Sequence, residues 1–109
     1  MKIVNLKYNE FEQFVRNHPL RNYYQSVAYG TLMSNFGFKP LYIGFVHEGK
    51  LVGASLILHV PIFMGFKYGY APHGILLNYN DYQLIPDAVK KLKSYLFRQS
   101  FLILKIDPL

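Results

Sequence analysis

The residues best suited to chemistry gather between positions 65 and 81. This stretch, GFKYGYAPHGILLNYND, contains four Tyr or Phe rings, three glycines, a proline and a histidine. Glycine and proline set unusual backbone dihedral angles, and each tyrosine offers an apolar ring with a polar hydroxyl. A strand with a purely structural role has no need of that mixture. We therefore expect residues 65–81 to form a binding site that the rest of the chain supports.

The composition is that of one globular domain. The chain has 109 residues, 51% of them hydrophobic and 17% charged. Its net charge of +6 suits an acidic partner such as phosphate, nucleic acid or an anionic membrane face, although a basic surface without a partner is the alternative. There is no cysteine, which excludes disulfides and thiolate chemistry, and the scattered histidines predict no metal site. Without a signal peptide or a membrane-spanning run, we expect a cytoplasmic protein.

The hydrophobic periodicity predicts a strand, two helices, three strands, a helix and a final strand, in that order. Asn9 and Ser26 are suited to cap the first two helices, and Pro86 fits only the first turn of the third. Residues 47–50 are expected to form the turn of a hairpin. The expected strands cover residues 2–6, 39–46, 51–60, 66–70 and 101–104, with a further short segment at 75–77.

The last expected strand indicates that the domain is incomplete. Residues 101–104 are apolar without alternation, as in a strand covered on both faces, and few residues follow to provide the covering layers. We therefore expect residues 1–109 to be part of a larger α/β protein. The order of elements matches the opening of an N-acetyltransferase (GNAT-type) fold, in the α/β (α+β) class: a mixed sheet with flanking helices, here as a partial domain.

Four blocks of the sequence together resemble a known family. Residues 18–30 contain HP, YQS and YG, which resemble the family's HP…FQS…WG. GKLVGA at 49–54 resembles its hairpin, and YGYAPHG followed by NY at 68–79 resembles YxYxPRGP…DY. LKIDP at 104–108 resembles the family's LKIDP. In this order, and over nearly the whole chain, the blocks are similar to the Fem family of peptidoglycan bridge-forming aminoacyltransferases.

The resemblance implies a full-length enzyme with two GNAT-like subdomains, of which residues 1–109 form the N-terminal part of the first. Such enzymes transfer an amino acid from aminoacyl-tRNA to the stem peptide of a peptidoglycan precursor, a lipid-linked or UDP-linked muramyl-pentapeptide. Aminoacyl-tRNA is the co-substrate, and no other cofactor is expected. We expect this segment to contribute to precursor binding without turnover alone, and we also expect a peripheral contact with the inner membrane face.

The resemblance also implies site residues within the central stretch. His73 replaces an arginine of the family pattern and cannot form that residue's bidentate fork, so it either binds a ligand or caps loop backbone. Asn78 replaces an aspartate, so Asp81, the nearest carboxylate, is the candidate catalytic residue, with helix capping as its alternative. The implied substrate-binding residues are Tyr68, Tyr70, His73, Gly74, Asn78 and Tyr79.

Several alternatives remain open at this point. Tyr68 and Tyr70 share one face of a strand and either line a groove for the sugar or stem peptide or fill the core. The basic residues between Lys90 and Arg98 either contact tRNA or the membrane or form a solvated helix face. One rival function is an acyl-CoA-dependent acyltransferase of the same fold, against which the glycine-poor residues 77–86 argue. The other is a non-catalytic module that binds RNA or glycan.

Overall fold

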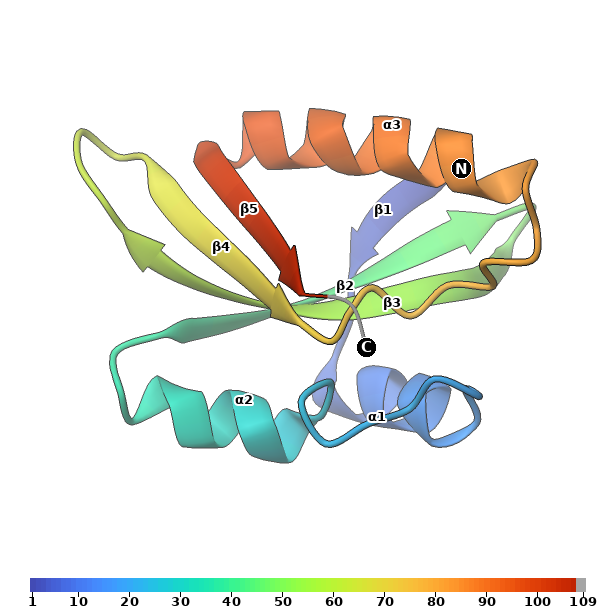
Figure 1. Ribbon diagram of the computed structural model, residues 1–109, viewed down its shortest axis with the longest axis horizontal. Coiled ribbons are helices and arrows are strands. Elements are labelled where there is room, and N and C mark those ends of the chain that lie inside the picture. The colour runs from blue at the N-terminus through green and yellow to red at the C-terminus, as the bar shows by residue number, and fades with distance from the viewer. Residues whose placement is uncertain (108–109) are drawn as a thin grey trace.

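The computed structural model describes residues 1–107, which form a five-stranded mixed sheet between two layers of helices (Figure 1). The sheet order is β1-β2-β3-β4-β5, with antiparallel neighbours except for the parallel pair β4 and β5. The elements are β1 (Lys2–Asn5), α1 (Tyr8–Arg16), α2 (Val27–Ser34), β2 (Lys39–His47), β3 (Lys50–Pro61), β4 (Lys67–Pro72), α3 (Leu84–Arg98) and β5 (Phe101–Asp107).

The two faces of the sheet bury separate apolar clusters. Figure 1 shows α3 over one face and α1 with α2 over the other. Because successive strand residues point to opposite faces, Ile57 packs with Leu92 on the α3 side, whereas Leu56 and Leu58 pack with Phe11 on the α1 side. This alternation along one strand explains how a single sheet supports both helical layers.

The predicted order of elements is confirmed, and most local signals act as expected. Ser26 caps α2 by accepting a hydrogen bond from the Tyr29 N–H at 3.0 Å. The predicted hairpin turn has Glu48 at φ 53° and Gly49 at φ 77°, as in a two-residue type I′ turn. The predicted cap at Asn9 is wrong, because α1 begins at Tyr8 after the N-cap residue Lys7. The Lys7 N–H is instead satisfied by Glu10 Oε1 at 2.8 Å.

One strand expectation needs correction, and another is left open. Residues 75–77 form no strand, only a bridge in which Leu76 and Ala54 exchange both backbone hydrogen bonds, at 2.9 and 3.1 Å. Among residues 1–107, β5 lies at the edge of the sheet and pairs with β4 alone, and its cover by further residues of a larger protein stays a prediction. Leu102 and Ile103 are accordingly 52% and 51% exposed.

The sheet opens between β3 and β4. Backbone pairing joins Leu58–Pro61 to Lys67–Tyr70, whereas Ala71 and Pro72 of β4 pair only with β5. The chain after β4 then returns to β3 at the bridge formed by Leu76. Between these two paired regions, the edge of β3 at Leu56 lacks a neighbouring strand, so its backbone groups need other partners.

The side chain of Gln25 fills this opening. Its Oε1 accepts from the Leu56 N–H at 2.7 Å, and its Nε2 donates to the Leu56 carbonyl at 3.2 Å and to the Pro72 carbonyl at 2.9 Å. Gln25 is fully buried. The carboxamide therefore offers β3 the donor and acceptor that a strand would offer, and it holds the end of β4 at a fixed separation.

Among residues 1–107, no helix has the length and apolar character needed to span a bilayer.

We predict that Gln25→Leu destabilises the fold by about 3 kcal/mol, because a leucine of similar size removes the partner of the buried Leu56 N–H and one hydrogen bond each from the Leu56 and Pro72 carbonyls. Urea denaturation measures this loss. The matched control is Gln13→Leu on the exposed surface of α1, for which we expect a change within about 0.5 kcal/mol. If the two variants had the same free energy of unfolding, the hydrogen bonds of Gln25 would contribute no more to stability than an exposed glutamine does.

A second prediction concerns Tyr42, which is buried against Phe11 with ring centroids 4.8 Å apart. Burial, with smaller contributions from Tyr8 and Glu12, raises the pKa of Tyr42 from 10.0 to about 12. Between these values the unfolded chain has lost a proton that the folded chain retains. Stability is therefore complete below pH 10 and falls as the pH rises toward 12, by up to about 2 kcal/mol from this group.

Denaturation at pH 10 and pH 12 tests this, because Tyr42→Phe should lessen the loss of stability between the two pH values. The control Tyr82→Phe alters a side chain that is 80% exposed and should leave the loss unchanged. An identical pH dependence in wild type and Tyr42→Phe would contradict the prediction.

Candidate functional site

Three tyrosines and a histidine form an open aromatic cluster beside the end of β4. The ring centroids of Tyr23, Tyr24 and Tyr29 lie 5.1 to 5.7 Å apart, all in edge-to-face geometry. The His73 ring lies 4.9 Å from that of Tyr24. We call these four residues the aromatic cluster. Tyr23 and Tyr24 are 53% and 44% exposed, so the cluster presents ring faces and hydroxyl groups to solvent.

Tyr70 extends this surface toward β5. Its hydroxyl donates to Asp107 Oδ2 at 3.1 Å, and the Lys105 ammonium lies 5.6 Å from its ring centroid. Burial raises the pKa of Tyr70, and the hydrogen bond to Asp107 and the nearby charge reinforce the shift. Tyr68 lies two residues earlier on β4, and both tyrosines are partly buried. The structure thus places Tyr70 and His73 near the end of β4, whereas Tyr68 lies near the start of this strand.

Two unpaired polar atoms lie next to the aromatic cluster. The Asn22 side-chain amide donates to the carbonyls of Leu20 and His73, at 3.1 and 3.2 Å. Asn22 Oδ1 and His73 Nδ1 are nevertheless buried without a hydrogen-bond partner among the described residues. Since buried polar atoms are normally paired, a polar group of a ligand would satisfy these two atoms once the side chains that cover them move aside.

Gly74 connects the cluster to the opening of the sheet. A Cβ atom at this position would lie 2.8 Å from Gln25 Nε2 and 3.0 Å from Ser55 Oγ. Because a real Cβ atom does not come within 3 Å of such groups, the glycine is required for the loop to pass over Gln25. The position of His73 therefore depends on the packing between Gly74 and Gln25.

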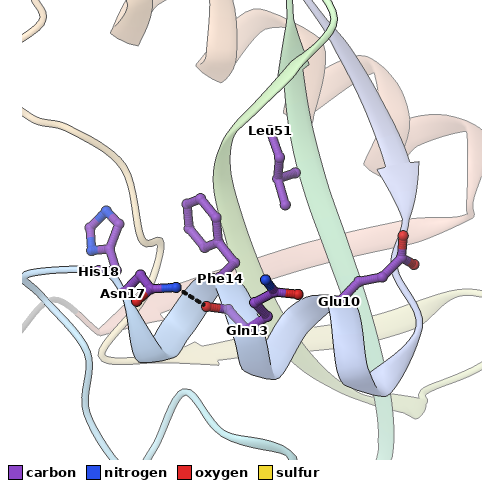
Figure 2. A pocket seen from close by; sticks show the side chains of 6 residues that line it. All are labelled: Glu10, Gln13, Phe14, Asn17, His18 and Leu51. Atoms are coloured by element: carbon purple, nitrogen blue, oxygen red, sulfur yellow. Dashed lines mark hydrogen bonds between the residues drawn. The ribbon is translucent and has the colours of Figure 1, made fainter.

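A second group of predicted residues lies in a cleft of about 580 Å³, which is lined by Asn78, Tyr79 and the Phe14–His18 pair. The rings of Phe14 and His18 are 5.4 Å apart, and the same pair also lines a neighbouring cleft of about 380 Å³. Figure 2 shows this smaller cleft, with Glu10, Gln13 and Asn17 along α1 and Leu51 from β3.

His18 is the titratable side chain common to both clefts. It is only 9% exposed, and burial lowers its pKa. Its Nδ1 accepts from the Leu20 N–H at 3.1 Å, so the neutral ring carries its proton on Nε2. The histidine thus offers a hydrogen-bond donor at the boundary between the two clefts.

The protein comparisons identify the family. The model of the FemAB family matches residues 6–109. This chain belongs to the FemAB family. It is 30% identical to aminoacyltransferase FemB of Staphylococcus epidermidis over 110 residues, which is 99% of this chain and 26% of that protein. It is 28% identical to aminoacyltransferase FemA of Staphylococcus aureus over 109 residues, with the same coverage of 99% and 26%.

Solved structures confirm the expected fold. The crystal structure of FemX matches with a TM-score of 0.80 at 18% identity, over 99% of this chain and 27% of FemX. A ribosomal-protein-alanine N-acetyltransferase from Brucella melitensis matches with a TM-score of 0.60 at 16% identity, over 100% of this chain and 81% of that structure. The FemAB chain therefore has a GNAT-like fold, and it spans about a quarter of the length of its curated FemA and FemB relatives.

Asp81 of this FemAB chain lies close to Asn78, whose backbone carbonyl accepts from the Asp81 N–H at 3.1 Å. Its exposed carboxylate accepts from the Leu84 N–H at 3.2 Å, at the start of α3. It lines a separate cleft of about 250 Å³ with His47 and Asp87. The geometry of helix capping is thus present, and a catalytic role for Asp81 stays a prediction.

The sequence did not single out Tyr23, Tyr24, Asn22 or His18 as site residues. Gln25 closes a turn with Asn22, whose carbonyl accepts from the Gln25 N–H at 3.1 Å, and nothing in the sequence showed that its side chain is fully buried. Two features of the sequence could have indicated these residues. One is the pair Tyr23-Tyr24 directly before a capped helix, and the other is the HP and YQS blocks. These blocks mark the segment but do not show that it packs against His73, which is separated from Asn22 by 51 positions.

We predict that Tyr24→Leu shifts the NMR resonances of the His73 ring, because the leucine removes the ring current of an aromatic neighbour at 4.9 Å. Loss of the edge-to-face pairs should also lower the free energy of unfolding by about 1 kcal/mol. Tyr82→Leu, at an exposed tyrosine outside the cluster, is the matched control and should leave the His73 resonances in place. Unchanged His73 resonances in Tyr24→Leu would show that the cluster does not form in solution.

Proposed function

We propose that this chain is part of a tRNA-dependent aminoacyltransferase that adds amino acids to the stem peptide of a peptidoglycan precursor. It would form the N-terminal part of the first of two GNAT-like subdomains, act in the cytoplasm and contribute to binding a lipid-linked or UDP-linked muramyl-pentapeptide. Aminoacyl-tRNA would be the co-substrate. The observation that carries the proposal is the FemAB family match over residues 6–109.

The aromatic cluster and Tyr70 supply the proposed precursor-binding surface. Tyrosine rings offer apolar faces to sugar and peptide groups, and their hydroxyls offer hydrogen bonds. Beside them, Asn22 Oδ1 and His73 Nδ1 have no partner among the described residues and would pair with polar groups of the precursor. Gly74 would place His73, while Asn78 and Tyr79 would line the adjoining cleft.

The transfer requires a deprotonated amine to attack an oriented aminoacyl ester. Binding the stem peptide in one position would reduce the entropy cost of that attack. Asp81 remains the proposed base, although its distance in the fold from the aromatic cluster means that the stem peptide would have to reach the start of α3.

The start of α3 argues against an acyl-CoA-dependent reaction. In the N-terminal turn of a helix, free N–H groups and the helix dipole would bind a pyrophosphate. Here the Leu84 N–H already pairs with the Asp81 carboxylate, and Asp87 adds a second negative charge in the first turn. The preceding residues 75–83 contain no glycine. A pyrophosphate at this helix would therefore meet two carboxylates.

The exposed lysines of α3 favour a contact with tRNA phosphates. Lys90, Lys91 and Lys93 are exposed on one helix. Such a contact would be strongly salt-dependent. A binding module for RNA alone would show the same salt dependence but no response to the precursor, which separates the two functions.

We predict that titration with UDP-linked muramyl-pentapeptide shifts the NMR resonances of the aromatic cluster and of Asn22. Tyr24→Leu should weaken this binding about tenfold, since stacking of a nucleic-acid base, such as the uracil of this ligand, on one aromatic side chain contributes about 1–3 kcal/mol. Tyr82→Leu should bind as wild type does. Resonances that shift only along α3, or no shift at millimolar ligand, would contradict precursor binding at this surface.

A further inference from the structure

The turn between β3 and β4 exposes four large apolar side chains at one tip. Ile62, Phe63, Met64 and Phe66 are 44%, 55%, 88% and 39% exposed. We call these residues the hairpin tip. β2 begins at Lys39 opposite His59, so β3 continues past its neighbour, and Figure 1 shows the hairpin projecting beyond the end of α3. The tip is thus a convex apolar protrusion.

The backbone of the hairpin tip is well ordered by its own hydrogen bonds. The Phe66 N–H donates to the Phe63 carbonyl at 2.9 Å, and the Ile62 N–H donates to the Phe66 carbonyl at 2.9 Å. Met64 and Gly65 both have positive φ, at 52° and 83°, as in a type I′ turn. At position 64, the first central residue of this turn, Asn or Asp would adopt the positive φ more easily than Met and would also be more soluble. Turn geometry and solubility therefore do not explain why a methionine that is 88% exposed occupies this position.

Cationic side chains surround the base of the hairpin. Lys39 and Lys67 flank β3 from either side, paired with His59 and Pro61. The Lys67 N–H also donates to the Ser100 carbonyl at 2.9 Å, which places the last turn of α3, with Arg98 and the 84% exposed Phe97, beside the hairpin. We call Lys39, Lys67 and Arg98 the basic collar.

The acidic side chains lie elsewhere. All six belong to the described residues: two in α1, one in the β2–β3 turn, two at the start of α3 and one at the end of β5. Both the β2–β3 turn and the start of α3 lie at the opposite end of the molecule from the hairpin tip (Figure 1). Among the described residues, the basic collar at the base of the hairpin therefore has no acidic side chain beside it.

We propose that the hairpin tip inserts into the interface of an anionic lipid bilayer while the basic collar binds the headgroup phosphates. A fluid bilayer accepts a convex apolar tip without a preformed cleft, whereas a protein partner would need a complementary hollow. Burial of the hairpin tip among the lipids and attraction of the basic collar to anionic headgroups would then both stabilise binding at this end of the molecule. This inference goes beyond the proposed function and does not depend on it, because the binding needs neither precursor nor tRNA.

Sedimentation with vesicles tests the proposal directly. The protein should bind vesicles of phosphatidylglycerol and phosphatidylcholine in equal amounts, bind pure phosphatidylcholine much more weakly, and be released by salt. Met64→Asn should lower the partition coefficient about tenfold, since it removes the most exposed apolar side chain of the tip. Because Asn-Gly favours a type I′ turn, this variant should fold at least as stably as wild type, so a loss of binding cannot come from unfolding.

Matched variants separate the electrostatic contribution of the basic collar from the apolar contribution of the hairpin tip. Lys39→Gln should weaken binding roughly fivefold, whereas Lys50→Gln, at the first residue of β3 and thus at its opposite end, should have little effect. Met64→Trp should show a blue-shifted fluorescence that brominated lipids quench, and Tyr82→Trp should not. Wild type that does not bind anionic vesicles, or Met64→Asn that binds them as tightly as wild type, would overturn the proposal.

Discussion

The arrangement of this domain depends on one buried carboxamide. Where β3 and β4 separate, the Gln25 side chain bonds to both backbone groups of Leu56 and to the Pro72 carbonyl, at 2.7 to 3.2 Å. An open sheet normally leaves unpaired backbone groups that are costly to bury. Here a side chain from the segment before α2 replaces the missing strand. β3 and β4 can therefore separate while the backbone groups of Leu56 stay hydrogen-bonded. The loop after β4 begins at this opening.

The same contact links the fold to the site. Because Gly74 passes directly over Gln25, the loop can turn His73 toward Tyr24, and Asn22 then holds the His73 carbonyl at 3.2 Å. The α1–α2 connection and the β4–α3 loop thus meet as one surface, although they are far apart in the sequence. Tyr24 from the first segment and His73 from the second become neighbours, and polar atoms without partners lie beside them. A ligand that bridges the two segments would reinforce contacts that the fold already makes.

The sequence predicted the elements well because their signals are local. Ser26 caps a helix, Glu48-Gly49 forms a hairpin turn, and strand alternation separates the two faces, each decided by residues close in the chain. The site was predicted only in part. Tyr70 and His73 were recognised from their own stretch, but Tyr24, Asn22 and Gln25 act through contacts across 31 to 51 positions. The cap expected at Asn9 failed for a simpler reason, since Glu10 satisfies the Lys7 N–H one turn earlier.

The most direct test of this account is native-state hydrogen exchange of the Leu56 amide. If the Gln25 carboxamide replaces a strand, the Leu56 N–H should exchange as slowly as the amides of β3 that pair with β4, and only through global unfolding. An amide that exchanges as fast as those of the exposed loop residues 78–82 would contradict the account. The opening of the sheet would then be held by the packing of the helices alone, and Gln25 would not determine where the site forms.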